Sequence, residues 1–443
     1  MQGPPTGSVA PRARSFWIQT LGCPKNDVDS HKLAGRLRAG GLEVAEKPGE
    51  ADLIVVNTCA FIEAARAESI ETILELSDLR REGARLAVTG CLAERSGEEL
   101  AEALPEVDLV AGFGAELTPA LDAAPVSFLT REELPAFDLL ELPRPPASAP
   151  WAYVKVAEGC DRRCGFCAIP SFRGPQRSRA LTSVLEEVER LDVSEVVLVA
   201  QDLASYGRDR SQASRLERDR ILNLVGAVAA RVDWVRLLYL YPSSLTDELI
   251  DAIVATGVPY FDLSLQHVSR PLLRRMRRFG ERDRIIERIG RIRSVAPEAA
   301  LRSSFILGYP GETEQDHDEL LSFIEEAELD WAGFFTFSRE AGTYADGLAE
   351  DLQVPGELAL ERLAECSELQ DAITARKRAS LVGRELRVLI EGDGRGRTYR
   401  EAPEIDGIVR LVVPGAAPGS FVTARCVGSE GPDLLAEVEG ESR

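Results

Sequence analysis

The stretch AEGCDRRCGFCAIP, residues 157–170, decides both the class of fold and the class of chemistry. Its cysteines, Cys160, Cys164 and Cys167, have the spacing C-x3-C-x2-C and directly follow a predicted strand. Three thiolates from one loop can bind three irons of a four-iron cluster and leave the fourth iron open to a cofactor or substrate. A structural zinc site needs a fourth Cys or His nearby, and none follows Cys167 at a suitable spacing. The pattern favours an iron–sulfur loop over zinc or three unrelated buried thiols.

Three further cysteines each follow a short β-branched run and precede a predicted helix. They are Cys23 in TLGCPKND, Cys59 in VVNTCAFIEAA and Cys91 in AVTGCLAER. In an open parallel α/β sheet the carboxyl ends of the strands face one crevice, so cysteines far apart in sequence can meet there. The alternative is three small buried residues, a role for which cysteine is well suited. Because all three occupy the same topological position, we predict that they converge on one site.

Length and composition are those of a folded protein with several domains. The chain has 443 residues, of which 44% are hydrophobic and 28% charged, and domains of about 100 to 200 residues predict two to four units. No apolar run long enough for a signal peptide or a membrane span is present, which favours a cytoplasmic location without membrane association. In that reducing compartment, eight cysteines indicate metal binding or catalysis rather than disulfides.

The first half of the chain alternates short strands with amphipathic helical stretches. We expect a flexible N-terminus over residues 1–14 and a Rossmann-like parallel α/β domain over 15–125. Its predicted strands are residues 15–20, 53–57, 86–89 and 108–110. A linker is predicted over residues 126–150, because the stretch LPRPPASAP, residues 142–150, is rich in proline.

The alternation of strands and helices resumes on a larger scale over residues 151–378. Six strand candidates predict a partial (β/α)6 barrel or an open parallel sheet. They are residues 153–157, 195–200, 235–241, 260–265, 301–307 and 333–337. A charge-rich helix is expected over 358–378. Short strands with glycine turns in residues 380–443 then predict a small all-β barrel of the OB type.

The loop of Cys160, Cys164 and Cys167, with Phe166 before the last cysteine, resembles that of the radical-SAM superfamily. The resemblance implies that S-adenosylmethionine (SAM) chelates the open iron and is cleaved to a 5′-deoxyadenosyl radical after one-electron reduction. It also implies SAM contacts from the ends of later strands, although each such residue could be an ordinary polar strand end. The implied cofactor-binding residues are Phe166, Gln201, Asp202, Ser264, Gln266 and Gly308.

Over nearly its full length the chain resembles the methylthiotransferase family of radical-SAM enzymes. The resemblance is carried by LGCPKNDVDS, VNTCAFIEAARAESI, VTGCLAER, EGCDRRCGFCAIPSFRG, LVAQDLASYG, FILGYPGET and YREAPEIDG. It implies a C-terminal TRAM domain and two four-iron four-sulfur clusters, with Cys23, Cys59 and Cys91 holding the auxiliary cluster that supplies or carries the inserted sulfur. One branch of this family methylthiolates the β-carbon of an aspartate in small-subunit ribosomal protein S-twelve. Pro24, Lys25 and Phe61, after the first and second cysteines, resemble the residues of that branch.

Charge bears on the choice between substrates. A TRAM domain that grips tRNA should be basic, but residues 380–443 contain eight arginines, no lysine and eleven acids, a net charge of −3, and the whole chain carries −21. This net negative charge favours a basic protein as the partner and makes tRNA adenosine the less favoured substrate. The resemblance also implies a low-potential electron donor such as flavodoxin or ferredoxin. A non-catalytic iron–sulfur scaffold is a further alternative, but it leaves the open iron unexplained.

Several other residues have plainer expected roles. We expect His267 to be a strand-end residue and His317 to be solvated. In the run of residues 270–278, Leu272, Leu273 and Met276 should face the core and the arginines should form a solvated face. Cys366 and Cys426 are expected to be packing residues. Removal of residues 381–443 is expected to leave both clusters intact.

Overall fold

The computed structural model describes residues 15–118, 127–128, 138–210, 220–412 and 416–438. The chain divides into two compact units, Met1–Pro145 and Pro146–Arg443, and each is described by itself. The N-terminus predicted to be flexible, residues 1–14, lies outside the described residues, as does most of the predicted linker before Asp138.

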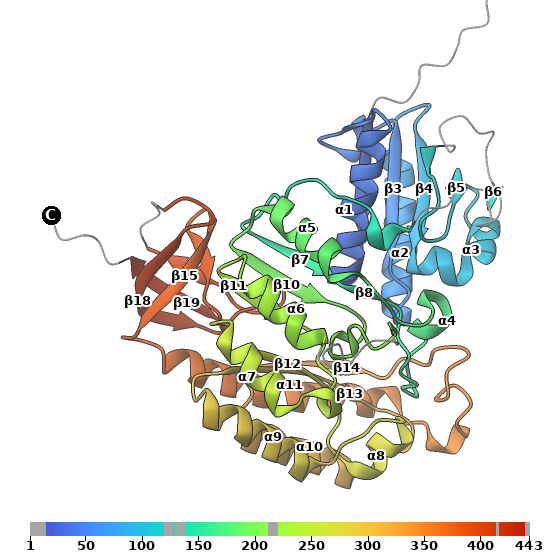
Figure 1. The fold of residues 1–443 in the computed structure, drawn as a ribbon. Coiled ribbons are helices and arrows are strands. Elements are labelled where there is room, and N and C mark those ends of the chain that lie inside the picture. Colours follow the sequence, from blue (N-terminus) through green and yellow to red (C-terminus); the bar gives the residue numbers. More distant parts are fainter. Residues whose placement is uncertain (1–14, 119–126, 129–137, 211–219, 413–415, 439–443) are drawn as a thin grey trace, which may run out of the picture. The chain divides into compact units, whose positions relative to one another are not determined.

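The first unit is built on a six-stranded parallel sheet in the order β2-β1-β3-β4-β5-β6 (Figure 1). The strands are β1 Ser15–Thr20, β2 Glu43–Val44, β3 Leu53–Thr58, β4 Arg85–Gly90, β5 Leu109–Val110 and β6 Ser127–Phe128. The helices are α1 Pro24–Ala39, α2 Glu63–Leu79 and α3 Cys91–Ala103. Every residue of β3 is buried, as expected for a parallel strand covered on both faces. The predicted Rossmann-like α/β fold is confirmed.

The second unit begins with six parallel strands. Two three-stranded sheets, β7-β10-β11 and β12-β13-β14, are joined by a parallel bridge between Leu240 and Leu263. The strands are β7 Trp151–Lys155, β10 Glu195–Val199, β11 Trp234–Leu237, β12 Tyr260–Gln266, β13 Ala300–Leu307 and β14 Trp331–Thr336. The antiparallel pair β8 Ala157–Glu158 and β9 Arg177–Ser178 follows β7. The predicted partial (β/α)6 barrel is confirmed.

Helices between the strands cover the barrel. They are α4 Ile169–Arg173, α5 Leu181–Leu191, α6 Arg220–Ala229, α7 Asp247–Ala255, α8 Arg270–Arg275, α9 Arg282–Val295, α10 Glu314–Ala327 and α11 Gly356–Ala379. Helix α10 shows how the sequence specifies one of them. Thr313 and Asp316 form a capping box at its start, and Leu320, Phe323 and Ile324 recur at helical spacing and are fully buried in the barrel core.

The C-terminal residues form a closed barrel in the order β15-β16-β17-β19-β18. Its strands are β15 Glu385–Gly392, β16 Arg395–Arg397, β17 Val409–Leu411, β18 Phe421–Glu430 and β19 Asp433–Val438. It has its own apolar core, which includes Val388, Val409 and Cys426. The predicted all-β barrel is confirmed, and Cys426 is buried as expected.

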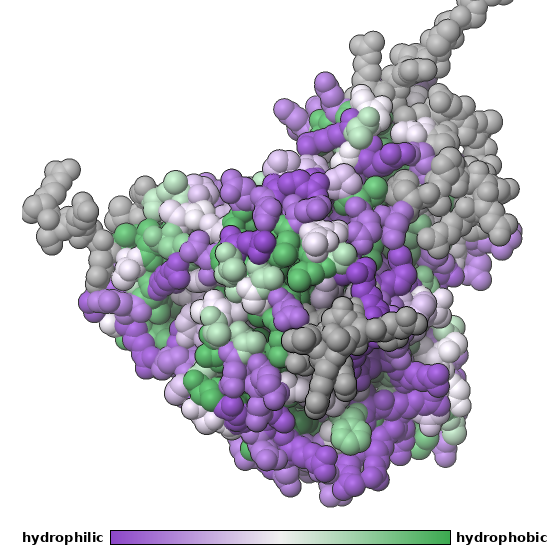
Figure 2. Space-filling view, viewed as in Figure 1, coloured by the Kyte–Doolittle hydropathy of each residue, from purple (hydrophilic) through white to green (hydrophobic). Residues whose placement is uncertain are grey.

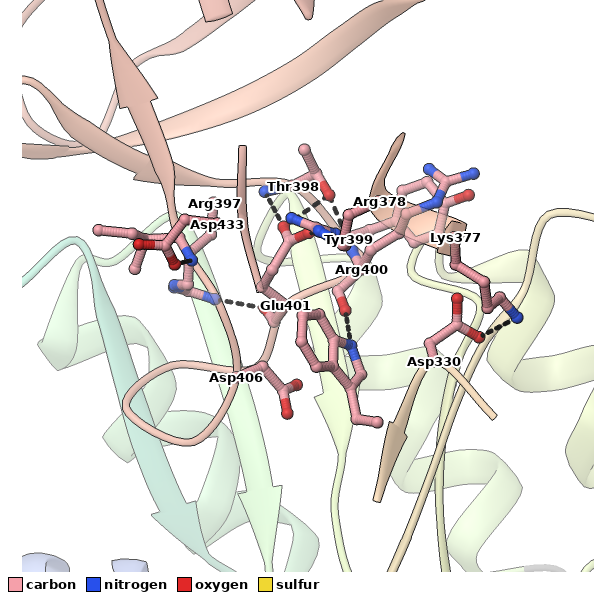
Figure 3. Close-up of polar contacts among 12 residues, drawn as sticks. Asp330, Lys377, Arg378, Arg397, Thr398, Tyr399, Arg400, Glu401, Asp406 and Asp433 are labelled. Carbon is pink, nitrogen blue, oxygen red and sulfur yellow. Dashed lines mark hydrogen bonds and ion pairs between the residues drawn. The ribbon is translucent and has the colours of Figure 1, made fainter. Parts of the chain in front are cut away.

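Polar side chains pack the C-terminal barrel against the larger one (Figure 3). The junction segment, residues 397–406, runs from the end of β16 toward β17 and contacts one side chain from each of the six parallel strands. Three of these side chains, on Glu195, Tyr260 and Trp331, belong to the first residues of their strands. The six side chains, from β7 to β14, are Tyr153, Glu195, Arg236, Tyr260, Arg302 and Trp331. Each contact is a hydrogen bond or an ion pair. The junction segment therefore covers the end of the barrel opposite the cysteine loop.

Buried charges dominate this junction. Glu195 accepts from Arg236 at 2.7 Å and from Arg397 at 2.8 Å, and all three side chains are fully buried. Arg378 of α11 pairs with Glu401 of the junction segment, as Figure 3 shows. Removing residues 381–443 would take Arg397 from Glu195, the Tyr399 carbonyl from Arg236 and Glu401 from Arg378. The prediction that such a truncation leaves both clusters intact stays a prediction, and these contacts predict that it lowers the stability of the larger barrel.

Apolar residues are concentrated in the interior of each unit. The main core of the second unit includes Val196, Leu198, Phe261, Leu301 and Phe305, all fully buried. The face drawn in Figure 2 is mostly hydrophilic, with apolar side chains in small patches. None of the described helices is both long and apolar enough to span a membrane.

Candidate cluster and cofactor site

Backbone hydrogen bonds fix the cysteine loop of the second unit, residues 160–167. Cys160 N–H donates to the Gly174 carbonyl at 3.1 Å, and Gly165 N–H donates to the Met276 carbonyl at 2.7 Å. Gly159, just before the loop, has a φ of +77°, and a Cβ there would lie 2.1 Å from the Pro175 carbonyl oxygen. Only glycine fits this turn. The loop is thus held at the carboxyl end of the barrel strands.

The three thiols of this loop influence one another. Burial raises the pKa of Cys160 to about 11, and the nearby negative charges of Asp202 and Cys164 add to the rise. Burial likewise raises the pKa of Cys167 to about 12, with Cys164 and Cys160 contributing and the positive charge of Arg278 opposing. Clustered thiols of this kind become thiolates when a metal supplies positive charge. The donor set therefore fits an iron–sulfur cluster.

In the described part of the chain, no group of three His, Cys, Asp or Glu side chains is close enough to share one metal ion. The thiolates of a four-iron cluster each bind a different iron. Ligands of a cluster are therefore spaced more widely than ligands of a single ion.

Glu158, two residues before Cys160, is a half-buried acceptor that the sequence analysis did not single out. It accepts from Lys155 at 2.6 Å, from Arg173 at 2.9 Å and from the Gln201 amide at 2.9 Å. Burial alone would raise its pKa, but the charges of Arg173 and Lys155 hold the pKa of Glu158 well below its usual value. Glu158 is therefore a carboxylate that orients Gln201.

Two buried oxygen atoms beside the loop lack a hydrogen-bond partner among the described residues. They are Oε1 of Gln201 and Oδ1 of Asp202, both just after β10. The other carboxylate oxygen of Asp202 accepts from Arg162 at 2.6 Å. Buried polar atoms without partners are rare in folded proteins. These two are suited to accept hydrogen bonds from a polar ligand such as SAM.

Ser264 and Gln266 lie at the carboxyl end of β12 and are half-buried. Between Leu263 and Gln266 the pairing with β13 shifts register, and Gln266 has a φ of +71°. The backbone of a residue other than glycine is strained in that conformation. Such strain is concentrated at functional sites. The carbonyl of Ser264 accepts from Arg278. Both predicted residues are therefore at the same end of the barrel as the cysteine loop.

Phe166 and Gly308 complete the predicted cofactor-binding set. The Phe166 ring packs against the apolar cluster of Leu272, Met276 and Tyr309. Gly308 follows β13 with a φ of +74°, and a Cβ there would lie 2.6 Å from that of Ala359. Its N–H already donates to Glu312 at 2.5 Å. The geometry therefore gives Gly308 a role in the turn.

The arginine run was predicted only in part. Leu272, Leu273 and Met276 are buried as expected, but Arg278 is 8% exposed and does not belong to a solvated face. The reason is local: α8 ends at Arg275, and Arg277 takes a left-handed conformation with a φ of +55°. This turn points Arg278 inward, where its Nη1 lies 3.2 Å from Cys164 Sγ.

The two histidines of this unit differ from each other. His267 is fully buried, burial lowers its pKa to about 4, and its Nδ1 accepts from the Ser269 N–H at 3.1 Å. The prediction that His317 is solvated is wrong, because its side chain is 3% exposed and its Nε2 lies 2.7 Å from Glu365. Asp318 is exposed and Asp316 caps the start of α10, while His317 faces Glu365 of α11. Cys366 is buried in the barrel core, as predicted.

In the first unit, the three cysteine-bearing turns follow the neighbouring parallel strands β1, β3 and β4. Gly22 has a φ of +89°, and a Cβ there would lie 2.7 Å from Cys59 Sγ, so the turn that carries Cys23 lies against Cys59. Cys91 Sγ is 3.6 Å from Oδ1 of Asn26. The three turns meet at one edge of the sheet.

Asn26 holds these turns together. It is fully buried, and its side-chain amide donates to the Leu21 carbonyl at 2.9 Å and to the Thr58 carbonyl at 3.0 Å. Its oxygen faces Cys91. One side chain thus contacts the turns before Cys23 and Cys59 and the third cysteine itself. No periodic pattern in the sequence predicts this role.

We expect Asn26→Ala to loosen the N-terminal cysteine site. The change leaves two buried carbonyls unpaired, which costs about 1–3 kcal/mol for each. Iron retained after gel filtration of reconstituted protein should fall toward the content of one cluster. His31→Ala, which removes an exposed side chain of the same helix, is the matched control. Equal iron retention in the two variants would contradict this role.

Comparison with known proteins identifies the family of the chain. Residues 15–112 match "Uncharacterized protein family UPF0004", residues 154–324 the "Radical SAM superfamily" and residues 382–438 the "TRAM domain". A relative from Streptomyces coelicolor, "Ribosomal protein uS12 methylthiotransferase RimO", is 42% identical over 96% of this chain and 97% of its own length. The chain belongs to the RimO family of methylthiotransferases. A relative of the same name from Moorella thermoacetica is also 42% identical, over 92% of this chain and 95% of its own.

Solved structures support the fold of this family member. A radical S-adenosylmethionine methyltransferase, TsrM from Kitasatospora setae, has a TM-score of 0.53 at 16% identity over 75% of this chain and 77% of its own. At that identity the likeness concerns the fold alone. Membership of the family makes the chain a radical-SAM enzyme, so the predicted cofactors, SAM and iron–sulfur clusters, are confirmed.

Proposed function

We propose that this chain adds a methylthio group to the β-carbon of an aspartate in ribosomal protein uS12. The observation that carries the proposal is the cysteine loop at the carboxyl end of the six-stranded barrel, beside the buried oxygens of Gln201 and Asp202. Full-length relatives named as uS12 methylthiotransferases support the substrate. Pro24, Lys25 and Phe61, near Cys23 and Cys59, support the same branch.

The chain's own residues would divide the work between two sites. Cys160, Cys164 and Cys167 would hold three irons of one cluster, and Cys23, Cys59 and Cys91 would hold the auxiliary cluster. When bound, the first cluster and SAM supply a radical that removes hydrogen from the substrate carbon.

The remaining predicted residues would bind and orient SAM. Gln201, fixed by Glu158, and Asp202, fixed by Arg162, would accept hydrogen bonds from SAM through their buried oxygens. Ser264 and Gln266 would line the site at the end of β12. Phe166, which packs against the apolar cluster of Met276 and Tyr309, would form the apolar wall of the SAM site. Gly308 would shape the turn after β13.

Charge supports a basic protein as the partner. Residues 380–443 carry a net charge of −3 and the chain carries −21, so the field favours a basic protein and disfavours tRNA. A low-potential protein such as flavodoxin or ferredoxin would deliver the electron. A cytoplasmic location follows from a ribosomal substrate.

The test offers the enzyme purified uS12 and unmodified tRNA together, with SAM, reductant and a sulfide source. Mass spectrometry should find one methylthio group on an aspartate of uS12. The yield should fall as salt shortens the Debye length from about 30 Å at 0.01 M to about 8 Å at 0.15 M. Modification of adenosine in place of aspartate would contradict the proposal and favour the tRNA branch.

A further inference from the structure

Arg278 is a buried cation directed at one cysteine of the radical-SAM loop. It is 8% exposed, and its Nη1 lies 3.2 Å from Cys164 Sγ. Its Nη2 donates to the Ser264 carbonyl, and its guanidinium carbon lies 4.3 Å from the centre of the Tyr241 ring. A sulfur, a carbonyl oxygen and an aromatic face therefore fix the side chain in one orientation.

No carboxylate of the described residues lies within ion-pair distance of Arg278. Arg162 provides the contrast: its guanidinium carbon lies 3.9 Å from the centre of the same ring, but it pairs with Asp202 at 2.6 Å. A buried cation without an anion is costly. The atom facing Arg278 that would carry negative charge is the sulfur of Cys164 as a metal-bound thiolate.

We propose that Arg278 sets the reduction potential of the cluster held by Cys160, Cys164 and Cys167. This inference rests on the proposed function, because it assumes that these cysteines hold the SAM cluster. A low-potential donor adds one electron, and hence one negative charge, to the cluster. A fixed cation that donates to a ligand sulfur stabilises the reduced form and raises the potential. Arg278 is therefore a positioning residue that acts through Cys164.

Arginine suits this place better than lysine. Its planar fork can donate to Cys164 and Ser264 at the same time while it lies over the Tyr241 ring, whereas an ammonium group is a point charge on a flexible stem. Arg278→Lys should keep the charge but lose this fixed geometry. Arg278→Gln should lose the charge as well.

The test is a redox titration of the full-length, anaerobically reconstituted protein followed by electron paramagnetic resonance, without SAM. SAM added at the end identifies the cluster by its altered signal. At a fixed solution potential, Arg278→Gln should raise the ratio of oxidised to reduced cluster about tenfold, equivalent to a midpoint ~59 mV more negative for one electron. Arg278→Lys should shift the ratio less. The matched control, Arg274→Gln, removes an exposed charge from the preceding helix, α8, and should leave the ratio unchanged.

Iron content and circular dichroism check that each variant is folded and loaded. If Arg278→Gln does not retain the cluster, Arg278→Lys and Tyr241→Leu, which removes the ring beneath the guanidinium, decide the question. Equal midpoints in these variants and the control would overturn the proposal. Unchanged midpoints with weaker SAM binding would also overturn it and assign Arg278 to the SAM carboxylate. Wild-type enzyme that modifies tRNA would refute the proposed substrate and leave the midpoint shift as predicted.

Discussion

Full-length protein with alanine at Cys160, Cys164 and Cys167 is expected to hold about four irons in place of about eight and to form no 5′-deoxyadenosine. The two cysteine triplets belong to separate compact units, so loss of one cluster should leave the other in place. Without the loop thiolates no open iron remains to bind SAM. Iron and sulfide analysis together with chromatography of the SAM products measures both effects.

The matched variant has alanine at Cys23, Cys59 and Cys91. It should also lose about four irons, but it should still cleave SAM reductively while transferring no methylthio group. Two results would contradict this division of roles. One is a single cluster in fully reconstituted wild-type protein, and the other is loss of 5′-deoxyadenosine formation in the folded N-terminal variant.

Glu195→Gln should destabilise the barrel strands by about 3–5 kcal/mol, the usual effect of breaking a buried ion pair. The charges of Arg236 and Arg397 lower the pKa of Glu195 in spite of its burial, so the native side chain is a carboxylate. The substitution leaves the buried Arg236 without its counterion and removes one of the two carboxylates that pair with Arg397. Native-state hydrogen exchange of β10, β11 and the junction segment should report the lower free energy of local opening.

The control for this prediction is Arg384→Gln. Arg384 pairs with Glu298 at 2.9 Å across the same junction, but both side chains are about half exposed. An exposed pair contributes at most about 1 kcal/mol, so exchange in β10 and β11 should hardly change. If the two substitutions had equal effects, the buried charges would not be what holds the junction together.

Most of the architecture could be predicted from sequence because it depends on local patterns. The strand at Ser15–Thr20 has the bounds expected for it, and the helix predicted over residues 358–378 is found at Gly356–Ala379. The two-residue strands β2, β6 and β9 were missed, since so few residues show no alternation. The expected places of the cysteines at strand ends agree with the structure, which brings each triplet to one edge of its own unit, and their role as cluster ligands stays a prediction.

The contacts around these cysteines could not be predicted in the same way. Arg278 is separated from its exposed neighbours by the left-handed turn at Arg277, and sequence periodicity does not report such a turn. The pair of Glu195 and Arg397 joins residues 202 positions apart. A charged residue in a sequence suggests a solvated surface, and only the packed structure shows where its partner comes from.

The junction segment limits how the C-terminal barrel of this protein could be exchanged for that of another protein. These six contacts come from six different strands, and two of them are charged pairs whose two members lie on opposite sides of the junction. A C-terminal barrel taken from another protein would bring new residues to one side of the junction only. It would leave unmatched charges inside the chimera unless the facing strand ends were exchanged with it. A stable exchange would therefore have to move the two barrels together, although each has its own fold.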